Sequence, residues 1–128
     1  MTDDESTRTE TAAFGDSARA GALLGAILEA TPLGGGVYRA DGTCVAISAT
    51  TERYSGGTRE ELLSQNFRDL GSWRDSGMTE AAERALDTGE AVHVDCRGTT
   101  TFGNPFWISA HFARFEVRGE RYLLLQFL

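Results

Sequence analysis

The side chains that most often support catalysis or metal binding are few in this sequence. There are two cysteines, Cys44 and Cys96, and two histidines, His93 and His111. Two thiols are too few to enclose a metal ion unless the histidines also contribute. In a chain without a secretory signal, two cysteines are more often reduced core residues than a disulfide. We therefore expect both cysteines to be small apolar strand residues.

Both histidines fall in segments that are typical of strands. In residues 90–96 apolar and polar side chains alternate, which places His93 and Asp95 on the same face of the strand. The Asp95 carboxylate could orient the imidazole or simply pair with it. We expect His93 and His111 to be hydrogen-bonded or solvated strand residues, with metal or haem ligation as the alternative.

Other catalytic patterns are weak. No Ser-His-Asp order and no paired-carboxylate spacing stands out among the 19 acidic residues. Residues 34–36 are three glycines, but no strand-then-helix context surrounds them and no lysine follows, so they are a poor phosphate loop. We expect them to give the chain freedom between a helix and the sheet. The sequence does not predict an enzyme, which would need a buried acid or base with a displaced pKa in a pocket.

Composition limits the partners of the chain. The 128 residues suffice for one domain with a single core. A formal net charge of −7 argues against nucleic acid or an anionic membrane as the main partner. The apolar run at residues 21–30 is shorter than the roughly 20 residues that a membrane helix needs. With an acidic, polar N-terminus, the chain is expected to be cytoplasmic and to make no membrane contact.

The first part of the chain divides into three segments. Residues 1–16 are polar and acidic and are expected to form a disordered tail. Residues 17–128 are expected to form the folded domain, beginning with a flanking helix over 17–30 that Pro32 ends. Residues 34–48 predict a β-hairpin, because two alternating segments flank Asp41-Gly42.

The rest of the chain predicts short helices followed by strands. Helical patterns over 49–67 are broken at Gly56-Gly57, and Thr58 with Glu61 predicts a capping box for the second helix. A short turn is expected at 66–73, and a helix from Thr79 to Thr88 that ends at Gly89. Three further strands are expected at 90–96, 105–115 and 121–128. This order predicts an α+β fold with a five-stranded antiparallel sheet.

The same order of elements resembles the PAS domain, a sensory module of bacterial and archaeal signalling proteins. The segment GGVYRADGTCVAISAT is similar to the first hairpin of that family, and ERYSGGTREELLSQNFRDL to the short helices that follow it. FWISAHFARF and GERYLLLQFL are similar to its closing hairpin. The resemblance covers roughly residues 20–128 and departs from the family at Ser48, where an asparagine is common. It implies a PAS fold in which short helices cover one face of the sheet and enclose a small cavity.

The resemblance also implies where a ligand would bind. A small, planar, mostly apolar molecule is expected between the sheet and the short helices. The residues expected near it are Val45, Ile47, Asn66, Phe67, Leu70, Trp73, Val94, Ile108, Ala110, Leu123 and Leu125. Flavin adduct chemistry is not expected, because residues 64–70 contain no cysteine, and typical haem ligation is not expected, because residues 77–90 contain no histidine. The cofactor, if any, stays open.

The function that this resemblance implies is regulatory rather than catalytic. We expect a sensor module of a larger signalling protein, such as a histidine kinase of a two-component system or a transducer. It would bind a small ligand, relay the signal to an effector domain of the same polypeptide, and form a homodimer. The alternative is a dimerisation or protein-interaction module without a ligand, joined through residues 17–30 and the exposed face of the sheet.

Overall fold

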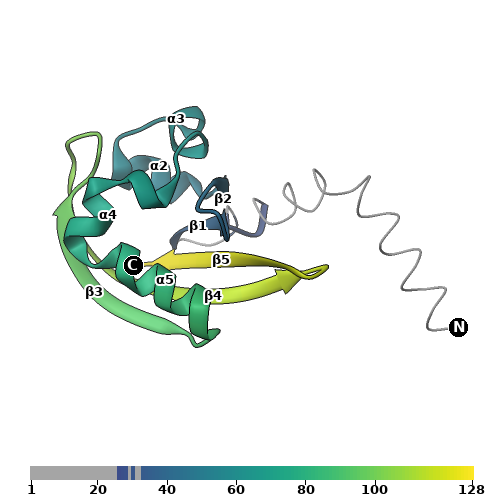
Figure 1. The fold of residues 1–128 in the computed structure, drawn as a ribbon. Coiled ribbons are helices and arrows are strands. Elements are labelled where there is room, and N and C mark those ends of the chain that lie inside the picture. Colours follow the sequence, from purple (N-terminus) through teal and green to yellow (C-terminus); the bar gives the residue numbers. More distant parts are fainter. Residues whose placement is uncertain (1–25, 29, 31–32) are drawn as a thin grey trace, which may run out of the picture.

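Five strands form one antiparallel sheet in the computed structural model, which describes residues 26–28, 30 and 33–128. The strands are β1 (Gly34–Arg39), β2 (Cys44–Ile47), β3 (Val92–Thr99), β4 (Pro105–Val117) and β5 (Glu120–Phe127). Their order in the sheet is β2-β1-β5-β4-β3, so the last strand of the chain lies beside the first (Figure 1). The predicted α+β class, the five-stranded antiparallel sheet and both hairpins are confirmed.

Short helices connect β2 to β3 and lie on one side of the curved sheet (Figure 1). They are α2 (Ala49–Ser55), α3 (Arg59–Leu63), the 3₁₀ turn η1 (Phe67–Asp69), α4 (Gly71–Ser76) and α5 (Met78–Thr88). The short turn predicted at 66–73 is instead two helical segments, η1 and α4. Helix α5 begins one residue earlier than predicted and ends at Gly89, as the sequence indicated.

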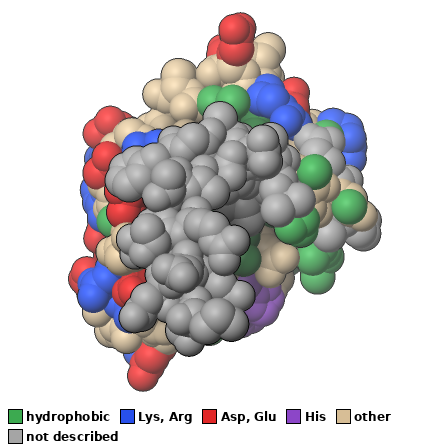
Figure 2. All heavy atoms as spheres, turned by 90° about the vertical axis from the view of Figure 1, so that its right-hand side faces the viewer, with side chains coloured by type: hydrophobic (Ala, Val, Ile, Leu, Met, Phe, Trp, Pro, Cys, Tyr) green, Lys and Arg blue, Asp and Glu red, His purple; other side chains and the backbone are tan. Residues whose placement is uncertain are grey.

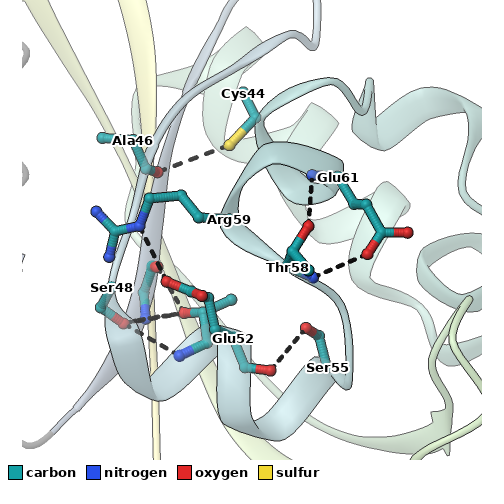
Figure 3. A network of polar contacts seen from close by, with 10 residues as sticks. Cys44, Ala46, Ser48, Glu52, Ser55, Thr58, Arg59 and Glu61 are labelled. Carbon is teal, nitrogen blue, oxygen red and sulfur yellow. Dashed lines mark hydrogen bonds and ion pairs between the residues drawn. The ribbon is translucent and has the colours of Figure 1, made fainter.

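Side-chain caps explain why α2 and α3 stay short and separate. The Ser48 hydroxyl accepts the Thr51 amide at the start of α2, and Gly56 ends the helix at a φ of 84°. Thr58 and Glu61 form the predicted capping box at the start of α3 (Figure 3). An ion pair of 2.9 Å between Arg59 Nε and Glu52 Oε1 joins the two helices. Each helix therefore has its own terminal contacts, and one longer helix does not form.

The two faces of the sheet carry different apolar clusters. The inner face, which α2–α5 cover, holds the main core, and we call its residues the inner-face cluster. The outer face holds a smaller outer-face cluster of Leu28, Val37 and Ala46, with Val45, Phe115, Tyr122 and Leu124 packed against it. Leu28 belongs to the predicted helix over 17–30, of which the structure describes residues 26–28, which are helical, and residue 30. The predicted tail at residues 1–16 lies outside the described residues.

Among the described side chains that are visible in Figure 2, neither charge dominates. Acidic and basic side chains lie interspersed along one side of the face shown, and hydrophobic side chains gather on the other side. Among the described residues, no helix has both the length and the apolar character needed to cross a membrane.

Candidate functional site

A cavity of about 90 Å³ lies between the inner face of the sheet and the short helices. Its wall combines residues from β1, β4 and β5 with residues from α2–α5 and from the loop between β3 and β4. The lining residues are Tyr38, Thr51, Tyr54, Ser55, Leu62, Gln65, Leu70, Ser72, Trp73, Met78, Thr100, Thr101, Phe102, Phe106, Ile108, Leu125 and Phe127.

Aromatic rings form the best-packed side of this cavity. Trp73 stacks on Phe67 with ring centroids 5.1 Å apart and meets Tyr38 edge-on at 5.2 Å. It also meets Phe112 edge-on at 5.9 Å. Such offset and edge-to-face pairs are favourable geometries for aromatic side chains. Because Trp73 touches rings from η1, β1 and β4, it fixes α4 against the sheet at one end of the cavity.

Two glycines of β1 make room for the rings of Phe127 and Tyr38 beside the strand. A Cβ atom at Gly34 would overlap the ring of Phe127, and a Cβ atom at Gly36 would lie 3.0 Å from the Tyr38 hydroxyl oxygen. A larger residue at Gly34 would displace the Phe127 ring, and one at Gly36 would press on the Tyr38 ring. Residues 34–36 thus do more than free the chain before the sheet, because they belong to strand β1 itself and two of them make room for aromatic rings.

The end of α2 and the β3–β4 loop close the cavity on another side. The Thr100 hydroxyl donates to the Ser55 carbonyl at 2.7 Å and accepts the Asn104 amide at 3.1 Å. The ring of Phe102 lies against Gly57, where a Cβ atom would overlap it. These contacts join segments 45 positions apart in the sequence. The loop is therefore positioned by long-range contacts rather than by its own local pattern.

The Tyr38 hydroxyl is the polar group that stands out at the cavity. Its residue is only 7% exposed, and the hydroxyl makes no hydrogen bond among the described residues. Burial, with a smaller contribution from nearby Cys44, raises the pKa of Tyr38 well above its usual value. The phenol therefore stays protonated at neutral pH and keeps a free donor. By contrast, the hydroxyls of Thr51, Ser55 and Thr100 are already bonded to backbone groups.

The structure brings together part of the residues that the sequence placed at the cavity. Those that line it are Leu70, Trp73, Ile108 and Leu125. Others lie in the inner-face cluster or pack against it without lining the cavity, namely Ile47, Phe67, Val94, Ala110 and Leu123. Asn66 does not line the cavity, because its Nδ2 donates to the Asp41 carbonyl at 2.9 Å and its Oδ1 accepts the Arg68 amide.

Val45 is the prediction that the structure corrects, because its side chain packs with the outer-face cluster. The pairing of β1 with β2 shifts register between Val37 and Tyr38, which pair with Ala46 and Cys44. Val45 is the extra residue of this bulge. One extra residue breaks the alternation that placed Val45 and Ile47 on one face.

Several lining residues were not predicted. Tyr38, Phe106 and Phe127 come from strands, and alternation could have found two of them, because Phe106 shares a face with Ile108, and Phe127 with Leu125. Those from helices and loops carry no periodic signal of their own. They are Thr51, Tyr54, Ser55, Leu62, Gln65, Ser72, Met78, Thr100, Thr101 and Phe102.

Neither cysteine lines the cavity. Both are buried and free, and burial raises the pKa of the Cys44 thiol to about 12 and also raises the pKa of the Cys96 thiol. A raised pKa means that both groups are neutral thiols at pH 7, which fits the prediction of apolar strand residues.

The histidines lie on the opposite, outer face of the sheet. Nε2 of His93 lies 2.6 Å from the Ser109 hydroxyl and 3.1 Å from Asp95 Oδ1, and its ring stacks on that of His111. This confirms His93 as a hydrogen-bonded strand residue that pairs with Asp95. Within residues 26–28, 30 and 33–128, no group of three or more histidine, cysteine and acidic side chains is arranged to hold a metal ion.

The cavity residues do not fit a cysteinyl-flavin or a histidine-ligated haem. The described wall contains no cysteine and no histidine, and a volume of about 90 Å³ is well below the roughly 300–1,000 Å³ typical of cofactor pockets. Its aromatic and aliphatic walls instead suit a small, mostly apolar molecule.

Comparison with known proteins agrees with this architecture. No protein-family model and no curated protein matches the sequence. Among solved structures, the PAS domain of an HTR-like protein from Haloarcula marismortui matches with a TM-score of 0.63 and 20% identity, over 95% of this chain and 98% of that one. A PAS domain from a two-component sensor histidine kinase matches with a TM-score of 0.65 and 14% identity, over 88% and 97%. The PAS domain of nitrogen regulation protein NR(II) from Vibrio parahaemolyticus matches with a TM-score of 0.65 and 13% identity, over 83% and 96%.

These matches agree with the arrangement of this chain, a five-stranded antiparallel sheet with short helices over one face. At such low identities the likeness is one of fold. The chain has the PAS fold.

Proposed function

We propose that this chain is a regulatory, non-catalytic sensor module of a larger signal-transduction protein and that a small, mostly apolar ligand binds in its cavity. The observation that carries the proposal is a cavity with aromatic walls where one donor, the Tyr38 hydroxyl, has no hydrogen-bond partner among the described residues. A concave apolar site with a few convergent polar groups is the usual form of a small-molecule site. The structural neighbours, which are PAS domains of sensor proteins, support the same role.

The signal would travel through the elements that share the cavity wall. A ligand there would contact Trp73 of α4, Ser55 of α2 and Phe127 at the end of β5. A ligand changes the balance of two arrangements only if it binds one of them more tightly. In this proposal the bound molecule stabilises one arrangement of the short helices on the sheet, and β5 carries the difference toward the effector.

Mass spectrometry of compounds released on denaturing the purified protein tests this proposal. We expect a stoichiometric small molecule, and re-addition of that molecule should raise the melting temperature by mass action. An inner-face variant such as Ile108→Trp, which would fill the cavity, should release none. Release of the same compound from this variant would contradict binding in the cavity.

A second candidate function is homodimerisation through the outer face of the sheet. Trp107 on β4 is 77% exposed and lies opposite Arg97 of the edge strand β3. Exposed aromatic residues are enriched at protein interfaces. A dimer module would show a melting temperature that rises with protein concentration, and Trp107→Ala would abolish that dependence. A melting temperature independent of concentration would exclude this candidate.

A further inference from the structure

The charge of the cavity wall limits which ligands it can take. Among the described residues, no side chain that lines the cavity is an acid, an arginine or a histidine. A buried carboxylate, phosphate or ammonium group of a ligand would therefore have no charged partner there. An ionised group without such a partner is strongly disfavoured in an apolar site. The wall thus disfavours any ligand whose ionised group would be enclosed in the cavity.

The size of the cavity sets a second limit. Its volume is about 90 Å³. A dry cavity of about 150 Å³ accommodates benzene. A single ring would need a modest adjustment of the wall, and Met78, which lines the cavity, has a flexible side chain suited to that adjustment. A ligand with two or more fused rings would require the helices themselves to move.

The third limit comes from the Tyr38 hydroxyl. It lies on the inner face above Gly36, within a residue that is 7% exposed, and it has no hydrogen-bond partner among the described residues. The hydroxyl oxygen itself is not fully enclosed, so water in the cavity can reach it. A ligand that displaces this water must supply an acceptor in its place, or it loses that hydrogen bond. The donor is held in place, because Phe67 and Trp73 both pack edge-on against the Tyr38 ring.

From these three limits we infer the ligand class, an inference that rests on the proposed function. The cavity selects a neutral molecule no larger than a single ring, and the molecule carries one oxygen or nitrogen acceptor that takes a hydrogen bond from the Tyr38 hydroxyl. Gln65 and Ser72 also line the cavity, and their side chains make no hydrogen bond among the described residues, so they provide secondary polar contacts.

Phenol, toluene and benzoate provide the test, because phenol and toluene differ only by a hydroxyl in place of a methyl group and benzoate adds a charge. Dissociation constants are measured by NMR titration on the wild type, on Tyr38→Phe and on Tyr122→Phe. The last is a matched control, because the Tyr122 hydroxyl bonds to Glu120 on the outer face. Tyr38→Phe removes no hydrogen bond that the described residues make, so it should fold with unchanged or slightly raised stability.

We expect the phenol hydroxyl and the Tyr38 hydroxyl to contribute to binding together, which a double-mutant-type cycle over ligand and protein measures. Tyr38→Phe should weaken phenol relative to toluene by about five- to tenfold, whereas Tyr122→Phe should leave that ratio unchanged. Benzoate should bind at least tenfold more weakly than phenol to all three proteins. An unchanged ratio in Tyr38→Phe, benzoate binding equal to phenol, or no binding of either neutral ring would each overturn the inference. The proposed function is judged separately, because release of a larger or charged compound from the cavity would preserve it while refuting this ligand class.

Discussion

Gly34 and Gly36 show at the scale of single residues how the backbone of β1 makes space for aromatic rings. Each lacks the Cβ atom that would meet the ring of Phe127 or of Tyr38. The rings can therefore lie against the sheet, and the space above them becomes the cavity. Glycine normally weakens a strand, so its use at these two positions is explained by the close approach of the rings.

Gly34→Ala should therefore lower the free energy of unfolding by about 1–3 kcal/mol, because the Phe127 ring must move out of its position. Gly71→Ala is the matched control, because a Cβ atom there would have no neighbour within 4 Å. It should leave stability unchanged or raise it by up to about 1 kcal/mol. Denaturant unfolding of both variants measures the difference. Equal effects of the two substitutions would contradict this account of β1.

At the scale of elements, helix caps and one turn hold the short helices in place. The Ser48 hydroxyl accepts amides from both Gly35 and Thr51, so it links β1 to α2. It occupies the place where the family often has asparagine, and it serves as the cap of α2 (Figure 3). Thr58 caps α3 in a more exposed position. The Thr58 cap uses hydrogen bonds between residues three positions apart, which is why the Thr58–Glu61 capping box could be predicted from the sequence, whereas the Ser48 bond to Gly35 spans 13 positions.

Because Ser48 is buried and Thr58 is exposed, the Ser48 cap should contribute more to the free energy of unfolding. Ser48→Ala removes one of the two acceptors of the Gly35 and Thr51 amides, which keep Thr51 Oγ1 and the Ser48 carbonyl. At this buried cap the loss should be about 1–2 kcal/mol, whereas Thr58→Ala should cost about 1 kcal/mol or less. Thr58→Ser should restore the stability lost in Thr58→Ala, because serine caps as well as threonine. Chemical denaturation of these three variants gives the comparison. A larger loss at Thr58 than at Ser48 would be inconsistent with the burial of the Ser48 hydroxyl.

The Asp41 carboxylate in the β1–β2 turn should make the stability of the protein depend on pH. Asp41 Oδ1 accepts the amide and the hydroxyl of Thr43, and these bonds, chiefly that from the amide, lower the pKa of Asp41. A lowered folded-state pKa gives stability that is present above the unfolded value of about 3.9 and is lost as the pH falls through the folded value. Asp41→Asn should be less stable than the wild type at pH 7, and the gap should shrink below about pH 4. Unfolding midpoints at pH 7, 4 and 3 measure it, and a gap independent of pH would refute the role of the carboxylate.

The sequence could predict elements whose signals are local. Alternation identified the faces of β3 correctly, with His93 and Asp95 exposed and Cys96 buried. It failed at Val45, because the bulge between β1 and β2 depends on pairing with another strand. The sequence also carries no signal for helix α4, because α4 begins directly after η1 and has no side-chain cap. The loop residues of the cavity depend on contacts such as Thr100 with Ser55, which no local pattern encodes.

At the scale of the whole molecule, the two faces of the sheet have separate roles. The inner face supports the cavity, and its order of strands brings β5 between β1 and β4, where Leu125 and Phe127 reach the cavity wall. The outer face carries the histidine pair, Trp107 and the smaller apolar cluster. The sequence predicted the fold, and the resemblance implied a cavity between sheet and helices, but the size and polarity of that cavity follow from the assembled structure.

The measurement that tests the central claim most directly is an NMR titration of the isotope-labelled protein with phenol, which reports binding residue by residue. The account predicts the largest chemical-shift changes at residues around the cavity, such as Tyr38, Trp73, Ile108 and Phe127, with little change at Trp107 and His93 on the outer face. Shift changes confined to the outer face, or spread evenly over the surface, would contradict the claim that the cavity is the ligand site.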